Sequence, residues 1–542
     1  MRTPRRIAAS VSACALVLPL LLVTAAPAAA VATTRYVATT GADTGTCTVN
    51  PCLTLQYAID QSTATDTIDI AAGAYVVNGL VSVDKQLTVK GAQSGVDACG
   101  RTGPESVLSN SQGLSVSASG VVFDGLTVQD SRVSAYTGYG VWLNPGVSGT
   151  VIVNTIFQNN IAGIGLANAG PAPALIRDNA FLHNNRPGGA GGSAIYTDQY
   201  VGGAVSNVLI DSNCFTDNNN AGVGFSNDDV ARPDSNVEIS NNTFDRNGRG
   251  VYFYNTSNIA VHDNRILDST VPTDGGTSVA IAAFGDVNGM AILNNDLLTG
   301  ARRGIRVGSF NVNPNKNVQA HYNNIVGFAY AGLEVDPGGH VGSMPAECNW
   351  WGSATGPSNP TNPGGTGDKV IGDASYRPWL TAPAPNGPCF GGRDSTPGKV
   401  TGGGQLPGTD PRFSAAGDLL TAPAIVPSAA NPTAQATFGF VVSCCRLKGN
   451  LEYNDHAADV RIKVKTIDGL FIEDGICGPN THATFVGTAT VYRATSTAME
   501  SFTVEVDDCG EPGTADTFSI QTDTYSNGPS VLLGGNIQIH RS

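Results

Sequence analysis

One short unit recurs along the middle of the chain and limits its fold more than any other feature. The unit is an alternating apolar segment, then an Asn, then an apolar residue two positions on, as in VIVNTIFQNN, VLIDSNCFTDNN and VEISNNTFDRN. The recurring Asn residues lie 22 to 34 residues apart: Asn154, Asn179, Asn213, Asn242, Asn264, Asn295 and Asn323. Such a repeat indicates a stacked architecture, in which each unit buries its apolar face against its neighbours.

A second phrase accompanies each Asn. It is a Gly or small residue followed by an apolar–x–apolar triplet, as in GVWL at Gly140, GVGF at Gly222 and GLEV at Gly332. Period-2 strands that are separated by Asn and Gly corners, without helices between them, exclude a doubly wound α/β sheet. The pattern predicts an all-β parallel β-helix of about ten coils, stacked at the strand spacing of roughly 4.8 Å.

The recurring Asn has a structural role in this prediction. An Asn at the same corner of every coil tolerates left-handed backbone and can pass side-chain amide hydrogen bonds along the stack. The alternative is that some of these Asn residues contact a ligand or glycan. At the start of the solenoid, the amphipathic segment CLTLQYAIDQ predicts a cap over the open apolar end.

Composition narrows the functions that such a fold can carry. Only 14% of the 542 residues are charged and 66 are Gly, which argues against coiled coils and helical bundles. The net charge of −14 argues against a nucleic-acid binder or a partner of anionic membranes, because both need clustered Lys and Arg.

The first thirty residues indicate export. Arg2, Arg5 and Arg6 precede the apolar run Val11–Val23, a pattern typical of a signal peptide over residues 1–30. The run is too short to span a bilayer with its flanks, and no later stretch is long enough, so we expect no transmembrane segment. We expect a secreted, extracellular protein, either free or associated with the cell surface, and a monomer.

The cysteine count agrees with export. Eleven cysteines fall to an even ten once residues 1–30 are removed, as expected in an oxidising compartment. Their connectivity stays open. We expect Cys47 to lie beside Cys52, with Cys99 as a competing partner for either, and Cys348 to pair with Cys389. The four C-terminal cysteines should pair among themselves (Cys444, Cys445, Cys477 and Cys509), and Cys214 should be a buried thiol.

Three phrases resemble a known superfamily. CTVNPCLTLQYAID with DTIDIAAGAY at the start, and NWWGSATGP from Asn349, resemble bacterial exported proteins of the right-handed parallel β-helix (pectin-lyase-like) superfamily. The resemblance covers about residues 35–385. It implies a right-handed β-helix over residues 31–390, with an N-terminal cap and a Trp-rich C-terminal cap. Pectate lyases, polygalacturonases and alginate epimerases belong to this superfamily.

The end of the chain has a different pattern. Pro and Gly crowd a linker at residues 391–399, and residues 400–542 alternate in segments such as ATFGFVV and FTVEVDD. With LEYNDH and DDCGEPGTADTFSI as its marks, this region resembles a small β-sandwich module appended to bacterial surface and secreted proteins. No catalytic role follows from that resemblance.

Aligning the triplets predicts one outward column of side chains. In chain order it holds Trp142, Gly165, Tyr196, Gly224, Tyr252, Ala280, Arg306 and Glu334. Successive aromatics would stand roughly 10 Å apart, near the reach of two sugar rings. We therefore predict that Trp142, Tyr196, Tyr252 and the nearby Tyr254 bind a polysaccharide or cell-surface glycan. The alternative is a ladder of aromatics that simply suits exposed strands.

The charged candidates for catalysis are Asp198, Asp228, Asp229, Arg306 and Glu334. Paired carboxylates can act as acid and base on a glycosidic bond. Carboxylates could instead hold calcium, the one cofactor considered, with Arg306 as the base for elimination across a uronic acid. The alternative is solvated loop carboxylates with a surface ion pair.

The catalytic motifs of the superfamily are incomplete in this chain. The NDD phrase of Asn227–Asp229 resembles part of the polygalacturonase carboxylate set, but the Gly-His-Gly element is absent. The sequence therefore favours a secreted β-helix that binds polysaccharide, with catalysis left open. The alternatives are a lyase or glycoside hydrolase acting on a uronic-acid-containing glycan, and a non-catalytic surface or structural protein.

Overall fold

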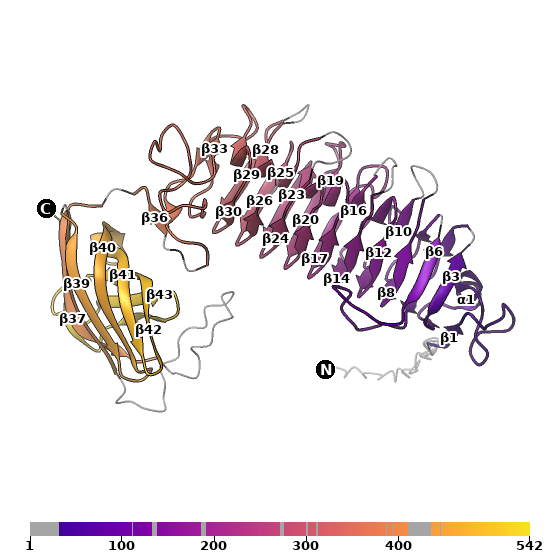
Figure 1. The fold of residues 1–542 in the computed structure, drawn as a ribbon, viewed down its shortest axis with the longest axis horizontal. Coiled ribbons are helices and arrows are strands. Elements are labelled where there is room, and N and C mark those ends of the chain that lie inside the picture. The colour runs from indigo at the N-terminus through magenta and orange to yellow at the C-terminus, as the bar shows by residue number, and fades with distance from the viewer. Residues whose placement is uncertain are drawn as a thin grey trace, which may run out of the picture.

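The computed structural model describes residues 32–77, 79–110, 112–132, 138–185, 191–270, 276–299, 302–309, 313–385, 387, 389–393, 395–409, 435–444 and 446–541. The expected signal peptide and Cys445 lie outside these residues. Figure 1 shows a long rod of stacked strands followed by a smaller curved sheet.

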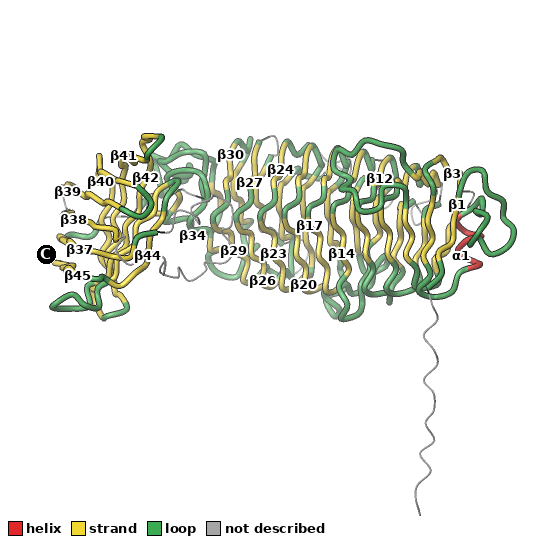
Figure 2. The backbone as a smooth tube through the Cα atoms, turned by 90° about the horizontal axis from the view of Figure 1, so that it is seen from below, coloured by secondary structure: helices red, strands yellow, loops and turns green. Residues whose placement is uncertain are grey.

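The rod consists of three parallel sheets, which we call A, B and C. Each strand pairs with its equivalent in the next coil, and Figure 2 shows the coils side by side along the rod. Sheet A contains β1 (Thr34–Val37), β2 (Thr67–Ile70), β5 (Thr88–Lys90), β8 (Val122–Asp124), β11 (Val151–Val153), β14 (Ala174–Arg177), β17 (Ser206–Asp211), β20 (Asp234–Ser240), β23 (Thr256–His262), β26 (Asn288–Leu293) and β29 (Lys316–His321). Sheet B contains β3 (Gly73–Val77), β6 (Ser106–Asn110), β9 (Thr127–Gln129), β12 (Ile156–Gln158), β15 (Ala180–Leu182), β18 (Cys214–Thr216), β21 (Thr243–Asp245), β24 (Arg265–Leu267), β27 (Asp296–Leu298) and β30 (Asn324–Val326). Sheet C contains β4 (Val81–Val83), β7 (Leu114–Val116), β10 (Tyr139–Leu143), β13 (Ala162–Gly165), β16 (Ser193–Thr197), β19 (Ala221–Ser226), β22 (Arg249–Tyr254), β25 (Val279–Ala283), β28 (Arg303–Val307), β31 (Ala331–Val335) and β33 (Val370–Ile371). The predicted parallel β-helix is confirmed.

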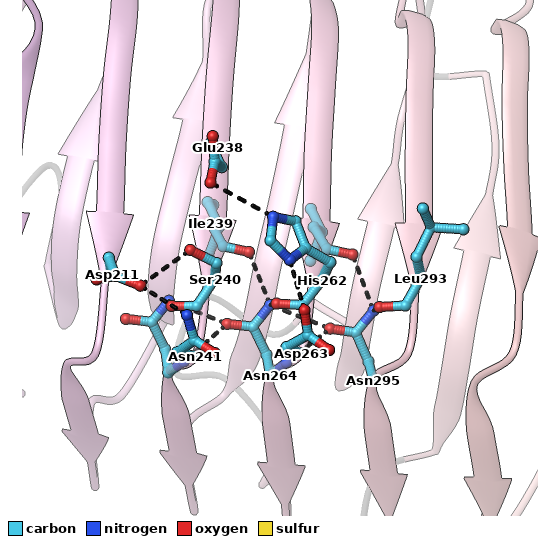
Figure 3. A network of polar contacts seen from close by, with 12 residues as sticks. Asp211, Glu238, Ile239, Ser240, Asn241, His262, Asp263, Asn264, Leu293 and Asn295 are labelled. Carbon is cyan, nitrogen blue, oxygen red and sulfur yellow. Dashed lines mark hydrogen bonds and ion pairs between the residues drawn. The ribbon is translucent and has the colours of Figure 1, made fainter. Parts of the chain in front are cut away.

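The repeated Asn residues form a buried ladder at the corner between sheets A and B (Figure 3). Asn264 accepts hydrogen bonds from the backbone N and Nδ2 of Asn242, at 3.0 and 2.9 Å, and donates to Oδ1 of Asn295 at 3.0 Å. The ladder runs through Asn179, Asn213, Asn242, Asn264, Asn295, Asn323 and Asn349. The side chains thereby satisfy buried backbone groups that the turn leaves unpaired.

The structure corrects the predicted ladder at two points. Asn154 is not a rung, because Thr155 takes that buried place while Nδ2 of Asn154 donates outward to Asp124 at 2.8 Å. The left-handed residue of each corner is the one before the rung, such as Asp263 with φ 55° and Asn294 with φ 53°. A second ladder, absent from the sequence analysis, follows the corner between sheets B and C through Asn160, Asn184, Asn218 and Asn247.

The interior of the rod is apolar and closed at both ends. Four stacked rings run along it, with centroids 4.5–5.0 Å apart: Phe157, Phe181, Phe215 and Phe244. Helix α1 (Leu55–Gln61) turns Leu55, Ala58 and Ile59 into the core at one end. At the other end, the buried Trp351 and Trp379 close the core. The short strands β32 (Met344–Pro345), β34 (Ala374–Ser375), β35 (Trp379–Leu380) and β36 (Cys389–Gly391) belong to this end.

Four disulfides lie within the described residues. Cys47–Cys52 and Cys348–Cys389 form as expected, and Cys477–Cys509 joins two of the four C-terminal cysteines. The fourth, Cys99–Cys214, closes a separation of 115 residues, so the expectation of a buried thiol at Cys214 is wrong. The cause is the loop after β5, which runs along the rod to the coil that carries Cys214.

The C-terminal unit is one antiparallel sheet of nine strands that curls into a sandwich-like module. Its order is β44-β43-β42-β41-β40-β39-β38-β37-β45. The strands are β37 (Gly398–Pro407), β38 (Gln435–Cys444), β39 (Lys448–Asp455), β40 (Val460–Gly475), β41 (Gly478–Arg493), β42 (Ser496–Asp507), β43 (Thr517–Thr522), β44 (Ser526–Val531) and β45 (Gly534–Arg541). One apolar core fills the concave side, which confirms the predicted sandwich-like class.

Candidate functional site

The outer face of sheet C carries the predicted column. Strand register places the following residues side by side across successive coils: Trp142, Gly165, Tyr196, Gly224, Tyr252, Ala282, Arg306 and Glu334. The prediction of Ala280 at this position is wrong, since Ala280 faces the core and Ala282 takes the place. The run of small apolar residues in β25 fits either alignment, so only the stacking of coils decides between them.

The alternation of aromatic and Gly residues has a packing cause. The ring of Tyr252 lies over Gly224, where a Cβ would stand 2.5 Å from Cζ of the ring. Trp142 and Tyr139 similarly cover Gly165, where a Cβ would stand 3.0 Å from Cδ1 of Trp142. Tyr252 is only 6% exposed. Its ring therefore lies against the sheet rather than standing free as a surface for a sugar.

The first half of the face is organised by Asp198. Its Oδ2 accepts a hydrogen bond from the Tyr196 hydroxyl at 3.0 Å, and its Oδ1 accepts from the backbone N of Tyr200 and Val201 at 2.8 and 2.7 Å. Burial raises the pKa of Tyr196, and the neighbouring Tyr252 and Asp198 raise it further. Trp142 donates from Nε1 to the carbonyl of Val201 at 3.2 Å. Asp198 thus holds a turn over the aromatic rings.

An aromatic cluster occupies the middle of the face. The rings of Tyr252 and Tyr254 meet edge to face at 6.0 Å, and Phe284 lies 5.3 Å from Tyr254. Two guanidinium groups lie over these rings, Arg249 at 5.6 Å from Tyr252 and Arg306 at 5.7 Å from Phe284. This aromatic cluster lies between Tyr196 and a group of charged residues further along the rod.

The charged group consists of two arginines and two carboxylates. Nη2 of Arg306 lies 2.9 Å from Oδ2 of Asp336, and its Nε lies 3.6 Å from Oε2 of Glu334. Nε of Arg303 also donates to Glu334, which is 8% exposed. The structure therefore brings the predicted Arg306 and Glu334 together as an ion-paired network. In this state neither carboxylate has the open geometry of a general acid or base.

The other predicted carboxylates lie apart from this network. Asp228 and Asp229 belong to the turn after β19, and Asp229 accepts from Nε of its neighbour Arg232 at 2.8 Å. The hydrogen bond from Arg232 lowers the pKa of Asp229. Arg232 thus occupies the carboxylate that was a candidate for catalysis.

A calcium site would need several carboxylates close together in the part of the chain that the structure describes. No three His, Cys, Asp or Glu side chains there are grouped as metal ligands. Glu334 and Asp336, the two carboxylates of the charged group, both form ion pairs with arginines. These residues do not fit the oxygen cage that calcium needs.

Several residues of the face were missed by sequence reasoning. Tyr139, Arg249 and Arg303 each stand three positions before a column residue, and this common offset was the available signal. Asp234 was also missed and had no such signal, and it lies not on this face but buried at the start of β20 in sheet A. Its Oδ1 accepts from the backbone N of Val205 at 2.8 Å, its Oδ2 is buried without a partner, and burial raises its pKa to about 7.

A match to a family model supports the fold. A family described as the right handed beta helix region matches residues 230–344, and no curated protein sequence matches the chain. Among solved structures, a mutant of an alginate lyase has 15% identity and a TM-score of 0.33, over 54% of this chain and 42% of that chain. The catalytic unit of a thermostable alpha-1,3-glucanase from Streptomyces thermodiastaticus has 14% identity and a TM-score of 0.32, over 60% of this chain and 66% of that chain. A pectate lyase has 12% identity and a TM-score of 0.25, over 65% of this chain and 80% of that chain. The chain thus spans less than two thirds of the first two proteins. No helix among the described residues is long and apolar enough to cross a membrane.

Proposed function

We propose that this right-handed parallel β-helix protein is exported and binds a polysaccharide along the outer face of sheet C, without cleaving it. The observation that carries the proposal is the register of the column. Trp142 and Tyr196 stand two coils apart, at roughly 10 Å, and both are partly exposed. Partly exposed aromatic rings along a regular strand face suit the stacking of sugar rings along one chain.

Sugar contacts fall to some of the predicted residues and not to others. Trp142, Tyr196 and Tyr254 keep part of their surface open, whereas Tyr252 is buried and packs edge to face against Tyr254. The network of Arg306 with Glu334 and Asp336 continues the same face and offers hydrogen-bonding groups at its far end.

Binding without cleavage is the better proposal because three of the four candidate carboxylates, all but the exposed Asp228, are occupied. Asp198 holds a turn, Asp229 holds Arg232, and Glu334 holds two arginines. A glycosidase needs one carboxyl group to donate a proton and a second, correctly spaced, to act as base or nucleophile. Export is favoured by the basic and apolar start of the sequence and by four disulfides, which suit an oxidising compartment.

Affinity electrophoresis of the purified protein against neutral and uronic-acid polysaccharides tests the proposal. We expect retardation by at least one polymer, and its loss in Trp142→Ala. Tyr36→Ala is the matched control, because Tyr36 is a 42% exposed aromatic residue on sheet A. Equal retardation of both variants would contradict the assignment to sheet C. Unsaturated products or new reducing ends in the same samples would replace it with a lyase or a hydrolase.

A further inference from the structure

The junction between the rod and the C-terminal sheet is fastened on both sides. On the rod side, the Cys348–Cys389 disulfide holds β36. On the other side, the backbone N of Thr396 donates to the carbonyl of Leu470 on β40 at 2.7 Å, and the backbone N of Leu470 donates to Oγ of Ser395 at 3.3 Å. These bonds hold the short connecting segment against both units.

Aromatic contacts complete the junction. The rings of Phe390 and Phe471 lie 6.1 Å apart, and the guanidinium of Arg393 lies 4.5 Å from the Phe471 ring centroid. Arg393 also forms an ion pair with Glu473. The space between the two units is therefore bounded by groups that hold one another in place, as in a preformed ligand site.

A cavity of about 430 Å³ lies at this junction. Its rod side includes Tyr322, Pro385 and Phe390, and its other side is the convex face of β41, β42 and β43. Phe471 and Val486 form a buried apolar patch on that face, at 2% and 1% exposure, outside the core of the sheet. The volume lies within the range of small-ligand sites.

Unengaged polar side chains stand beside the apolar patch. Ser501, Thr503 and Glu505 alternate on the outer face of β42, and Gln521 lies directly opposite Thr503 on β43. The side chains of these four residues form no hydrogen bond or ion pair with any part of the chain that the structure describes, and Ser501 is joined to Asp523 only through its backbone N. The cavity therefore combines aromatic rings with hydroxyl, amide and carboxylate groups that are ready to pair.

We propose that this cavity is a second binding site, separate from sheet C, for a short neutral oligosaccharide. A sugar ring offers an apolar face to Phe390 and a rim of hydroxyl groups to Thr503 and Gln521. Charge selects against acidic sugars, because Glu505 is a free carboxylate while the charge of Arg393 is taken by Glu473. The site would let the C-terminal module hold one glycan while the rod holds another.

Isothermal titration calorimetry of the full mature chain tests this site with cellohexaose, maltohexaose, xylohexaose, mannohexaose and hexagalacturonate as probes. We expect at least one neutral hexasaccharide to bind and hexagalacturonate not to bind at this site. Thr503→Val, which keeps the shape and removes the hydroxyl, should weaken the neutral ligand about tenfold. Gln521→Ala, an exposed change that leaves the core of the sheet intact, should weaken it similarly.

The controls separate this site from sheet C. Thr497 lies on the same face of the same strand outside the cavity, so Thr497→Val should bind as the parent protein does. Trp142→Phe should also leave the neutral ligand unaffected, whatever it does to polymer binding. The proposal is overturned if no neutral hexasaccharide binds, if Thr503→Val and Thr497→Val behave alike, or if only the Trp142 variant loses binding.

Discussion

Replacing Asn264 by Leu tests whether the buried ladder holds the coils together. Asn264 is 1% exposed and joins three coils through its side chain. Its Oδ1 accepts from the backbone N of Asn242 at 3.0 Å, and its Nδ2 donates to the carbonyls of Ile239 and His262 at 2.8 and 2.9 Å (Figure 3). Leu has a similar volume and can pair with none of these groups.

The expected loss in the free energy of unfolding follows from the hydrogen-bonding groups that lose Asn264 as a partner. The backbone N–H of Asn242 loses its acceptor, and the carbonyls of Ile239 and His262 each lose a donor. The side-chain amides of Asn242 and Asn295 each lose one of their several hydrogen bonds. An unsatisfied buried group costs about 1–3 kcal/mol, and the carbonyls retain a second lone pair. We therefore expect Asn264→Leu to lower the free energy of unfolding of the rod by about 3–5 kcal/mol.

Urea unfolding followed by tryptophan emission measures this loss on the rod alone. All four Trp residues, Trp142, Trp350, Trp351 and Trp379, lie in the rod and its C-terminal cap. The matched control is Asn288→Leu on the neighbouring strand β26, where the side chain is exposed and accepts one hydrogen bond from Asn317. A difference between the two variants below about 1 kcal/mol would refute the reasoning.

Three further predictions concern packing and pH. The raised pKa of Asp234 means that the folded state keeps a proton the unfolded state has lost, so the free energy of unfolding should fall by roughly 3 kcal/mol from pH 4 to pH 7. Asp234→Asn should remove that slope in urea titrations. Replacing both Cys99 and Cys214 by Ser removes a disulfide that links residues 115 positions apart, and it should lower the free energy of unfolding by about 4–5 kcal/mol. An unchanged urea midpoint would contradict this expectation. Gly224→Ala should displace the Tyr252 ring and lower the free energy of unfolding by about 1–3 kcal/mol, measured as a lower melting temperature. Gly364→Ala, where no atom lies within 4 Å of an added Cβ and φ is not left-handed, is the control and should leave the melting temperature unchanged.

The aromatic column shows how far the sequence could predict a site. Trp142 and Tyr252 were placed correctly because each lies between two apolar residues that must face the core, and Tyr196 because it lies between the buried Ile195 and Thr197. The prediction failed at Ala282, where every neighbour is small and apolar. The sequence also predicted that the Tyr252 ring is exposed and binds sugar, whereas in the structure the ring packs on Gly224 and is buried.

The sequence by itself determined the coils, since the apolar alternation and the polar corners repeat within each unit and specify its strands locally. Only the tertiary structure decided which side chains meet across the stack. The Cys99–Cys214 bridge, the pairing of Arg303 with Glu334 and the place of Thr155 in the ladder join residues at least 24 positions apart. Such contacts depend on loop paths and on the stagger between coils, which arise when the coils stack and are not encoded in any one repeat.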